Sequence, residues 1–316
     1  MERKNNYAIQ AQNAKKIFLS YDQNALAEKL GLRTDDRYLY TALLGQPYRI
    51  ARKTGDLERL ENGAWSDANS FDEVLTLLDL VCDSRAAEYY ASLGLDFLWD
   101  DGMHPLLDAM PDDINATAFW AAGKLYAVAA MKAPCVMLDT DLICWQNIDA
   151  LLDGADAAAI HREDIIPSIY PGKSAFSRSR GFDFDAFDWS VQPLNTALCS
   201  FSDDDFRRFY ADTAIRFMRS APQADDTLTY MVFAEQRLLA MCAEKAHIRI
   251  RALSDLPSLF GGAQNGYFSH VWGFKQQMRE NPALYEDFCR RCAARLRRDF
   301  PAEAEMIARI PALSVF

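Results

Sequence analysis

The chain has 316 residues, of which 50% are hydrophobic, and it carries a formal net charge of -11 at pH 7. This length suits one large α/β domain or two smaller ones, and the apolar content is ample for a sizeable core. The acidic balance argues against general binding of nucleic acids or of anionic membranes. No stretch approaches the roughly 18 uninterrupted apolar residues of a transmembrane helix, and the first residues lack the apolar core of a signal peptide. We therefore expect a cytoplasmic protein without a transmembrane segment.

Strand-like and helix-like segments alternate along the chain, which favours an α/β fold with a mostly parallel central sheet and helices on both faces. Residues 16–20 indicate a first strand, and residues 75–82 end in another. A helix is expected over 84–93, capped by its first serine and ended by Gly94. A strand over 95–99 would then complete a βαβ unit.

The middle of the chain contains the segments that frame the first motif. A helix is expected to open at Asn115 and to stop at Pro134. The apolar run 135–138 (Cys-Val-Met-Leu) follows and is typical of a buried central strand, and residues 157–160 indicate another strand. Residues 164–189 are aromatic-rich and irregular, which suggests a loop or lid that faces an acceptor.

The last third of the chain is predicted to be mainly helical. We expect a catalytic domain over residues 1–278 and a helical extension, residues 279–316, packed on it. The elements expected before that extension are a strand at 195–201, helices at 203–220 and 225–244, and a short strand at 248–251.

The helix of that extension is amphipathic and crowded with five arginines: Arg290, Arg291, Arg295, Arg297 and Arg298. The favoured interpretation is a helix packed on the domain with its arginines solvated, and peripheral contact with a membrane surface is the alternative. The chain has seven cysteines, an odd and mostly scattered set that fits reduced thiols better than a disulfide framework. Cys289 and Cys292, on the same helix, indicate packing because no second ligand pair completes a zinc site.

A first motif, Asp139-Thr140-Asp141, directly follows the apolar run 135–138. Two carboxylates at i and i+2 where a buried strand ends can offer oxygen ligands to a divalent cation. Open α/β sheets also bind their ligands beyond the carboxyl ends of their strands. The acidic triplets that begin at Asp183 and Asp203 lack this context, since one lies in an aromatic, polar stretch and the other is typical of a helix start.

A second motif, His270-Val271-Trp272-Gly273-Phe274-Lys275, supplies complementary groups. Its imidazole can complete the protein ligands of a cation. Gly273 lets the backbone approach a diphosphate without a Cβ in the way, and Lys275 can meet the phosphates that the metal holds. The two motifs together predict a metal-diphosphate site.

The other three histidines, His104, His161 and His247, have no second ligand residue at a suitable spacing. Each is more typical of a surface or hydrogen-bonded histidine than of a metal ligand. His161 differs from the others because it follows a strand and should emerge near the carboxyl edge of the sheet.

These motifs resemble those of GT-A glycosyltransferases, and the chain is most similar to the retaining family 8 enzymes and to related bacterial glycosyltransferase-like proteins. The resemblance runs in order over residues 115–275 and implies the GT-A fold. It also includes Trp120-Ala121-Ala122-Gly123-Lys124-Leu125, Asn195-Thr196-Ala197 and Glu235-Gln236. The family usually has Asn-Ser-Gly and Asp-Gln at the last two places, differences that bear on the identity of the sugar more than on the fold.

The resemblance assigns a role to each matching residue. Asp139, Asp141 and His270 would bind Mn²⁺ or Mg²⁺. The catalytic residues that the resemblance implies are Gln236, which matches the residue beneath the anomeric carbon of the donor, and Glu235 beside it, which matches a sugar-contacting position. The expected donor contacts are Lys275, Gly273, Lys124, Asn195 and Thr140, with Ser20 and Tyr21 as candidates for recognition of uracil.

The resemblance implies transfer of a hexose from a nucleoside-diphosphate sugar, with a UDP-sugar as the favoured donor, to a hydroxyl group with retention of configuration. The metal would neutralise the diphosphate, and Lys275 would stabilise the charge that develops on the leaving phosphate. The acceptor would be a carbohydrate, a lipid-linked molecule or a protein. Because the amide of Gln236 is a poor nucleophile, front-face displacement is preferred to covalent catalysis.

Two other classes of function stay open. The run Val136-Met137-Leu138-Asp139-Thr140-Asp141 also resembles the nucleophile loop of haloacid-dehalogenase-type phosphatases, in which the first aspartate is phosphorylated. That loop normally lies near the start of its domain and has no His-x-x-Gly-x-Lys partner. A catalytically silent nucleotide-sugar-binding protein is the second alternative.

Overall fold

The computed structural model describes residues 42–46, 50–51, 73–74, 77–96, 99, 102–139, 142–144, 148–260, 267–271, 275–299 and 301–310. The strand predicted at 16–20 lies outside these ranges. So do five predicted site residues: Ser20, Tyr21, Thr140, Asp141 and Gly273.

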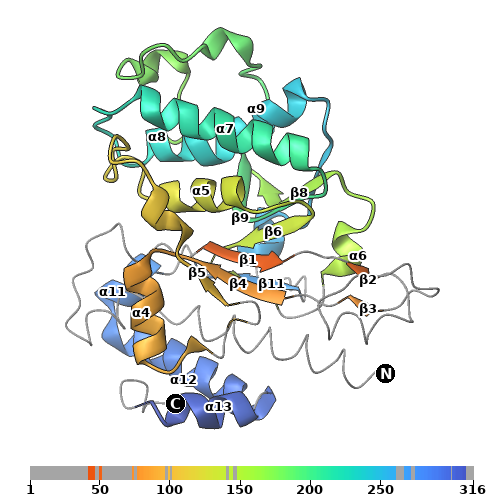
Figure 1. Ribbon diagram of the computed structural model, residues 1–316, viewed down its shortest axis with the longest axis vertical. Coiled ribbons are helices and arrows are strands. Elements are labelled where there is room, and N and C mark those ends of the chain that lie inside the picture. The colour runs from red at the N-terminus through yellow and green to blue at the C-terminus, as the bar shows by residue number, and fades with distance from the viewer. Residues whose placement is uncertain are drawn as a thin grey trace.

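A seven-stranded sheet crosses the middle of the molecule in the order β10-β8-β9-β6-β1-β4-β5 (Figure 1). Its strands are β1 (Ala42–Gln46), β4 (Leu77–Val81), β5 (Met103–His104), β6 (Cys135–Leu138), β8 (Ala157–Arg162), β9 (Leu194–Phe201) and β10 (Ile250–Ala252). Two small sheets pair β2 (Ile50–Ala51) with β3 (Glu73–Val74), and β7 (Leu142–Cys144) with β11 (Phe268–His270).

The large sheet is mixed, so the prediction of a mostly parallel sheet is wrong. Two neighbouring pairs, β10 with β8 and β4 with β5, are parallel, and the other four are antiparallel. The strands β1 and β9 therefore run against the remaining five. For β9 the reason lies in the connection from β8, which is irregular and contains no long crossover helix, so that the chain returns antiparallel beside its predecessor.

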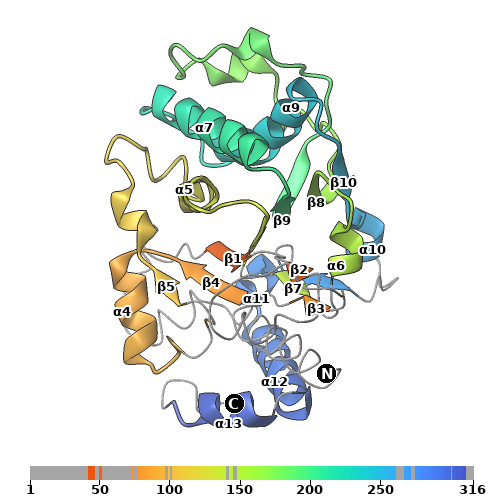
Figure 2. The ribbon, with the colours of Figure 1, turned by 45° about the vertical axis from the view of Figure 1, so that its right-hand side comes forward.

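Helices cover both faces of the sheet (Figures 1 and 2). On one face lie α5 (Ala122–Ala130), α7 (Asp204–Ser220), α8 (Thr229–Val232) and α9 (Leu238–Lys245). On the other lie α4 (Ser84–Ser92), α11 (Lys275–Glu280), α12 (Pro282–Asp299) and α13 (Pro301–Ala308). Shorter elements are α6 (Asp149–Leu152), α10 (Leu256–Phe260), η2 (Leu106–Ala109), η3 (Lys173–Phe176) and η4 (Phe184–Ala186).

The central strand β6 is buried on both sides, as its apolar run predicts. Cys135 and Met137 belong to the core under α5 and α7, whereas Val136 and Leu138 belong to the core on the α4 and α12 side. Successive side chains of a strand point to opposite faces, and a strand covered on both faces is apolar throughout. This placement sets Asp139 at the end of a rigid element between two cores.

The βαβ unit predicted near residue 80 is present, although its second strand lies elsewhere. Asp83, rather than Ser84, caps α4 by accepting a hydrogen bond from the amide of Ala86 at 2.7 Å, and Gly94 follows the helix with φ of 67°. The strand parallel to β4 is β5.

The strand predicted at 95–99 is not present at its described residues, Leu95, Asp96 and Trp99. The Leu95 amide bonds back to the Tyr90 carbonyl at 3.0 Å, and the Trp99 amide bonds to the Asp96 carbonyl at 3.1 Å, so the segment turns instead of extending. The indole of Trp99 packs edge-on against Tyr90, with ring centroids 5.9 Å apart. The apolar side chain of Trp99 thus packs against α4 and does not belong to a strand.

The helix α5 begins later than predicted, at Ala122 instead of Asn115. The Asn115 carboxamide oxygen accepts hydrogen bonds from the amides of Thr117 and Ala118, and its nitrogen donates to the carbonyl of Ala224 at 2.9 Å. Asparagine side chains that bond to nearby backbone groups compete with helix formation. Residues 115–121 accordingly form successive turns before the helix.

The elements from β8 onward agree closely with the predicted ranges, with two differences. The helical run expected at 225–244 begins later, at Thr229, and contains a π-helix, η5 (Phe233–Arg237), between α8 and α9. The second motif starts at the last residue of a strand, β11, where His270 pairs with Leu142 of β7; the predicted elements do not include this strand.

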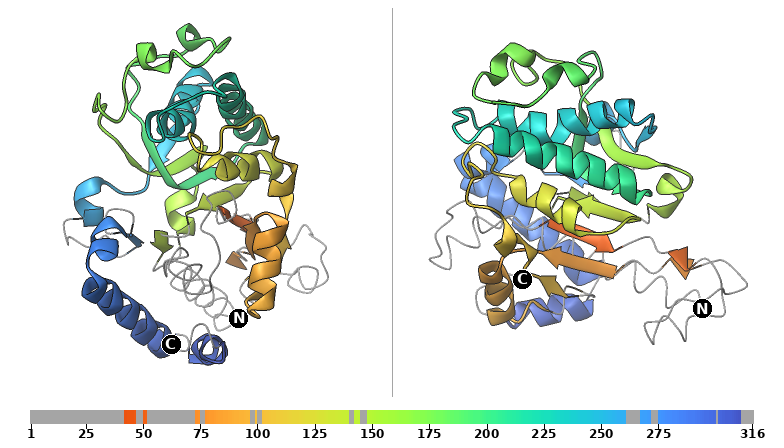
Figure 3. Two further views of the ribbon diagram at one scale, coloured as in Figure 1. Left: turned by 90° about the vertical axis from the view of Figure 1, so that its left-hand side faces the viewer. Right: turned by 45° about the horizontal axis from the view of Figure 1, so that its top comes forward.

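The connection between β8 and β9 is irregular, as predicted, and its aromatic residues pack onto the helical layer. Phe176 and Phe184 are stacked 5.6 Å apart, and Trp189 is stacked on Phe233 of η5 at 5.4 Å. In both views of Figure 3 this green segment lies over the layer of teal and cyan helices. Its role as an acceptor-facing loop or lid stays a prediction.

The N-terminus of α7 is joined to the turn before β6 by Asp204. Its Oδ1 accepts a hydrogen bond from the Ala133 amide at 2.8 Å and another from Nε of the buried Arg207 at 2.9 Å. Arg207 in turn donates to the carbonyl of Ala129 at the end of α5, at 3.0 Å. A carboxylate thus connects α7, α5 and the entrance of β6.

We expect Asp204→Asn to reduce the fall in the free energy of unfolding as the pH is lowered from 4 to 2. The hydrogen bonds from Arg207 and from the Ala133 amide lower the pKa of Asp204 from 3.8 to about 2. Because the folded-state pKa is the lower one, its stabilisation is present above pH 4 and is lost as the pH falls toward 2. Because the side chain is partly exposed, we expect the variant to lose about 1 kcal/mol of the free energy of unfolding above pH 4. Urea unfolding between pH 2 and 7 measures this loss. Asp205→Asn, at an exposed position beside it, should change the curve less.

The helices α12 and α13 contribute Cys289, Cys292, Ala304 and Ile307 to the same buried cluster as β4 and β6. Four of the five predicted solvated arginines of α12 are exposed, Arg290, Arg291, Arg297 and Arg298, whereas Arg295 is half-buried. Arg291 pairs with Asp287 at 2.9 Å. The six cysteines whose burial the structure describes are all buried free thiols. Across the described residues, no helix is long and apolar enough to cross a membrane.

Candidate functional site

Several predicted site residues lie along one edge of the large sheet, where β6 and β8 end and the antiparallel β9 begins. The Asp139 amide donates to the Ala197 carbonyl at 2.7 Å, which extends the β6–β9 ladder by one residue. On the other side of β9, His161 is paired with Asn195. Asp139, Asn195 and His161 therefore share an edge through three neighbouring strands.

Lys124 of α5 is the centre of a polar network at this edge. Its ammonium nitrogen lies 2.7 Å from Oδ1 of Asp139 and also donates to Oε1 of Glu235. That same carboxylate oxygen accepts a hydrogen bond from the hydroxyl of Thr196 on β9. One lysine thus joins the end of β6, the start of β9 and the π-helix.

The network is buried at one end and open at the other. The side chain of Glu235 is 5% exposed and that of Lys124 11%, whereas Asp139 reaches 27%. Burial alone would lower the pKa of Lys124, but the carboxylates of Asp139 and Glu235 outweigh it and raise that pKa above its ordinary value. One ammonium thus contacts two carboxylates, of which that of Asp139 is the more exposed.

The π-helix η5 holds both predicted catalytic residues, Glu235 and Gln236. The hydroxyl of the buried Tyr210 on α7 donates to the main-chain carbonyl of Glu235 at 2.7 Å. The hydroxyl of Tyr170, from the irregular connection, donates to the side-chain oxygen of Gln236. Single π-turns are frequent at functional sites, and this one presents the carboxylate to Lys124 and the amide to Tyr170.

Asn195, a predicted sugar contact, is held by neighbours at the same edge. Its oxygen accepts from the Ala197 amide at 3.1 Å, and its nitrogen donates to Oε1 of Glu163 at 3.2 Å. Glu163, Tyr170 and Thr196 were not among the site residues predicted from the sequence. Only Thr196 carried a signal, because it lies within the Asn-Thr-Ala segment.

His270 reaches the neighbourhood of the first motif through β11. That strand pairs antiparallel with β7, and His270 is opposite Leu142, the residue that directly follows Asp141. His270 is buried, at 6% exposure. Lys275 begins α11 and is half-buried.

The predicted metal ligands have atoms of the type that binds a divalent cation. The oxygen of Asp139 and the imidazole nitrogen of His270 are ligands that Mn²⁺ accepts, and Asp141, the third predicted ligand, lies outside the described residues. Within the part of the chain that the structure describes, no three His, Cys, Asp or Glu side chains form a metal-binding group. The structure thus describes two of the three predicted ligands, Asp139 after β6 and His270 on β11.

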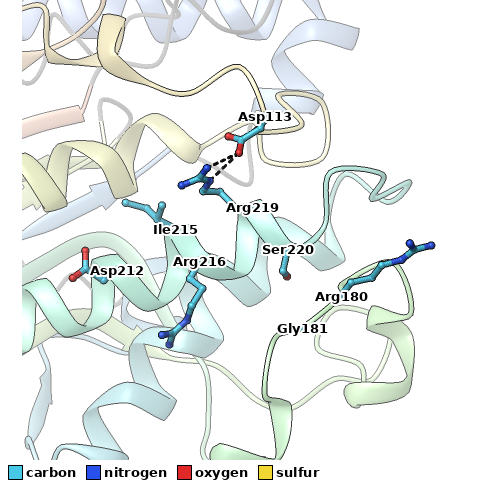
Figure 4. Close-up of a pocket in the computed structure, with 8 residues that line it drawn as sticks. All are labelled: Asp113, Arg180, Gly181, Asp212, Ile215, Arg216, Arg219 and Ser220. Atoms are coloured by element: carbon cyan, nitrogen blue, oxygen red, sulfur yellow. Dashed lines mark hydrogen bonds and ion pairs between the residues drawn. The ribbon is translucent and has the colours of Figure 1, made fainter.

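A surface pocket lies away from this edge, on the outer side of α7. Its volume is about 550 Å³, and it is lined by Asp113, Arg180, Gly181, Asp212, Ile215, Arg216, Arg219 and Ser220. Arg219 is paired with Asp113 at 2.8 Å, and Figure 4 shows Arg180 and Arg216 directed away from each other. The charges do not converge on a ligand position, and no predicted site residue lines the pocket.

Comparisons with known proteins yielded no relative: no protein-family model, no curated protein and no solved structure matches this chain.

Proposed function

We propose that this protein is a metal-dependent glycosyltransferase of the GT-A fold, which moves a hexose from a nucleoside-diphosphate sugar to a hydroxyl acceptor with retention of configuration. A UDP-sugar is the donor to test first. The observation that carries the proposal is the pairing of β11 with β7, which sets His270 opposite the residue after Asp141. Two motifs that are distant in the sequence thereby meet, as ligands of one cation must.

The Lys124 network supports the same proposal from independent contacts. The resemblance identified the segments that contain Asp139, Thr196 and Glu235. The Lys124 ammonium group contacts Asp139 and Glu235, and the Thr196 hydroxyl donates to Glu235. A chance resemblance would not be expected to bring segments from a helix, two strands and a π-helix into one hydrogen-bonded group. The network holds the Asp139 carboxylate at the open end of the sheet edge.

The chemistry follows from what these residues can do. A divalent cation, when bound, would neutralise charge on the donor diphosphate and so make it a better leaving group. Asp139, Asp141 and His270 would hold that cation, with Lys124 fixing the orientation of Asp139. Lys275 would bind the diphosphate and stabilise the charge that develops as the bond to the sugar breaks.

Gln236 supports front-face displacement over a covalent intermediate. Its amide oxygen already accepts the hydrogen bond from Tyr170, and an amide is a weak nucleophile. We propose that Gln236 lies beneath the anomeric carbon and that Glu235, charged and buried, sets its position through the shared π-helix. The incoming hydroxyl would then approach from the side of the departing phosphate.

A donor panel with and without metal tests the proposal. We expect at least tenfold tighter binding of one UDP- or GDP-sugar with Mn²⁺ than without it, a difference of about 1.4 kcal/mol or more. Asp141→Ala should remove that gain, because it deletes a carboxylate ligand, and calorimetric titration measures both. Asp212→Ala, an exposed aspartate on α7, is the matched control and should bind like the wild type.

Other outcomes separate the competing classes of function. Failure to bind any donor, combined with hydrolysis of p-nitrophenyl phosphate that is lost in Asp139→Asn, would replace the proposal with a phosphatase. Metal-dependent binding without donor hydrolysis or transfer to any acceptor would identify a nucleotide-sugar-binding protein.

A further inference from the structure

We propose that Tyr170 is a positioning residue, which binds the oxygen of the Gln236 amide and so directs the NH₂ group of that amide at the donor sugar. The inference rests on the proposed function, because the sugar is the one that the donor brings to this edge. It involves none of the predicted metal ligands. It gives Gln236 the role of a hydrogen-bond donor to an oxygen atom of the sugar.

The hydrogen bond from Tyr170 decides which end of the amide meets a ligand. The tyrosine hydroxyl donates to Oε1 of Gln236, and among the described residues this is the one hydrogen bond of the Gln236 side chain. A carboxamide accepts through its oxygen and donates through the two hydrogens on its nitrogen. Because the protein already uses the oxygen, the half-buried side chain offers its two N–H donors to a ligand.

The chemistry of a buried tyrosine disfavours the opposite orientation of the amide. Tyr170 is 5% exposed, and burial raises the pKa of its hydroxyl. The carboxylates of Glu163 and Glu235 raise that pKa further, against the charge of Arg237. The hydroxyl therefore keeps its proton, and a buried donor without an acceptor is costly. The oxygen of the Gln236 amide is an acceptor, whereas its nitrogen is not.

The tyrosine is held in place by its own segment. Its main-chain amide donates to the Ile166 carbonyl at 2.7 Å, which closes a turn. Further along the same connection, Phe176 packs on Phe233 of η5 with ring centroids 4.5 Å apart. The connection thus contacts the π-helix at Phe233 as well as at Gln236, so the Tyr170 hydroxyl approaches the amide from a fixed direction.

The main chain that carries Gln236 is fixed independently of Tyr170. The Tyr210 hydroxyl donates to the Glu235 carbonyl at 2.7 Å, and the Glu235 carboxylate is bound by Lys124 and Thr196. A donor that is oriented before the ligand arrives loses little conformational freedom on binding. Removing the Tyr170 hydroxyl should therefore release the amide without moving its main chain.

The side-chain amide signal of Gln236 reports this contact directly. We would record NMR spectra of the full-length protein labelled with ¹⁵N-glutamine and identify the signal by its loss in Gln236→Leu. Tyr170→Phe should shift the NH₂ signal, because the amide oxygen loses its hydrogen bond. In the matched control, Tyr230→Phe, the lost hydroxyl accepts from the Arg178 amide of the same connection at 3.2 Å, and the signal should stay in place. An unshifted signal in Tyr170→Phe would overturn the inference.

Turnover shows whether the orientation of the amide matters to the sugar. We would measure hydrolysis of UDP-glucose, UDP-galactose, UDP-N-acetylglucosamine and GDP-mannose with Mn²⁺. On a donor that the wild type uses, Tyr170→Phe should lower kcat by about tenfold or more and change KM by less than about threefold. The diphosphate keeps its contacts, whereas the NH₂ group is no longer aligned on the sugar. Tyr230→Phe should keep both constants, and an equal loss of kcat in that variant would show a general loosening of the connection and contradict the inference.

The same measurements separate this inference from the proposed function. If the wild type turns over a donor and Tyr170→Phe does so with an unchanged kcat, the inference fails and the proposed function stands. If the wild type turns over no donor of the panel, both fail, because no sugar then depends on Gln236.

Discussion

Replacing Lys124 with methionine should lower the free energy of unfolding by about 3 kcal/mol, at the low end for breaking a buried ion pair. The substitution removes the only described cation that contacts both Asp139 and Glu235. It leaves the 5% exposed carboxylate of Glu235 with the Thr196 hydroxyl but without a counter-charge. A buried, uncompensated charge is far less stable than the same charge in water. Urea unfolding at pH 7, followed by circular dichroism, measures the change.

Two comparisons isolate the buried charge. The double variant Lys124→Met with Glu235→Gln should be at least about 1 kcal/mol more stable than the two single effects add up to, because the buried position 235 then carries no charge that needs the lysine. Lys173→Met is the matched control, since Lys173 pairs with Asp185 at a solvent-exposed position. We expect it to change stability by less than about 0.5 kcal/mol. Equal effects at the two lysines would contradict a buried network.

Replacing Arg237 with methionine should weaken the attachment of the irregular connection between β8 and β9 to the helical layer, so that this segment opens more often. Arg237 is 2% exposed, and its guanidinium donates to the carbonyls of Val191 at 2.6 Å and Trp189 at 2.8 Å. It also lies over the Trp189 ring, with its central carbon 5.7 Å from the ring centroid. Methionine can make none of these hydrogen bonds. Two carbonyls without their partner imply a loss of about 2–3 kcal/mol.

The released segment should become a substrate for trypsin, which cleaves after Lys173, Arg178 and Arg180 within it. Because proteolysis follows the population of the open form, we expect cleavage there to be at least tenfold faster than in the wild type. Mass spectrometry of the fragments locates the cuts. Arg216→Met on the exposed side of α7 is the control, and fast cleavage in that variant would show that the effect is not specific to Arg237.

The elements that the sequence predicts correctly depend on short-range patterns. The apolar run 135–138 is a strand buried on both faces, and Asp203 caps a helix that begins at Asp204. Gly94 follows α4 with a positive φ that an L residue adopts less readily. Each of these features involves residues only a few positions apart, and their side-chain and backbone preferences are sufficient to specify them.

The candidate site depends on pairings that no local pattern contains. Strand direction in the mixed sheet and the opposition of His270 to Leu142 are set by which distant strands bond to each other. The contact of Lys124 with Glu235 requires α5 and the π-helix to pack on one face.

The sequence by itself determined the strand that ends just before Asp139, the residue types of the two motifs and the irregular aromatic connection. Only the tertiary structure decided the antiparallel β9, the π-turn at Glu235 and the inclusion of Tyr170 in the site. The physical reason is that helix and strand periodicity report which face of an element is buried, whereas the partner of each buried polar group is chosen by packing between elements far apart in the chain.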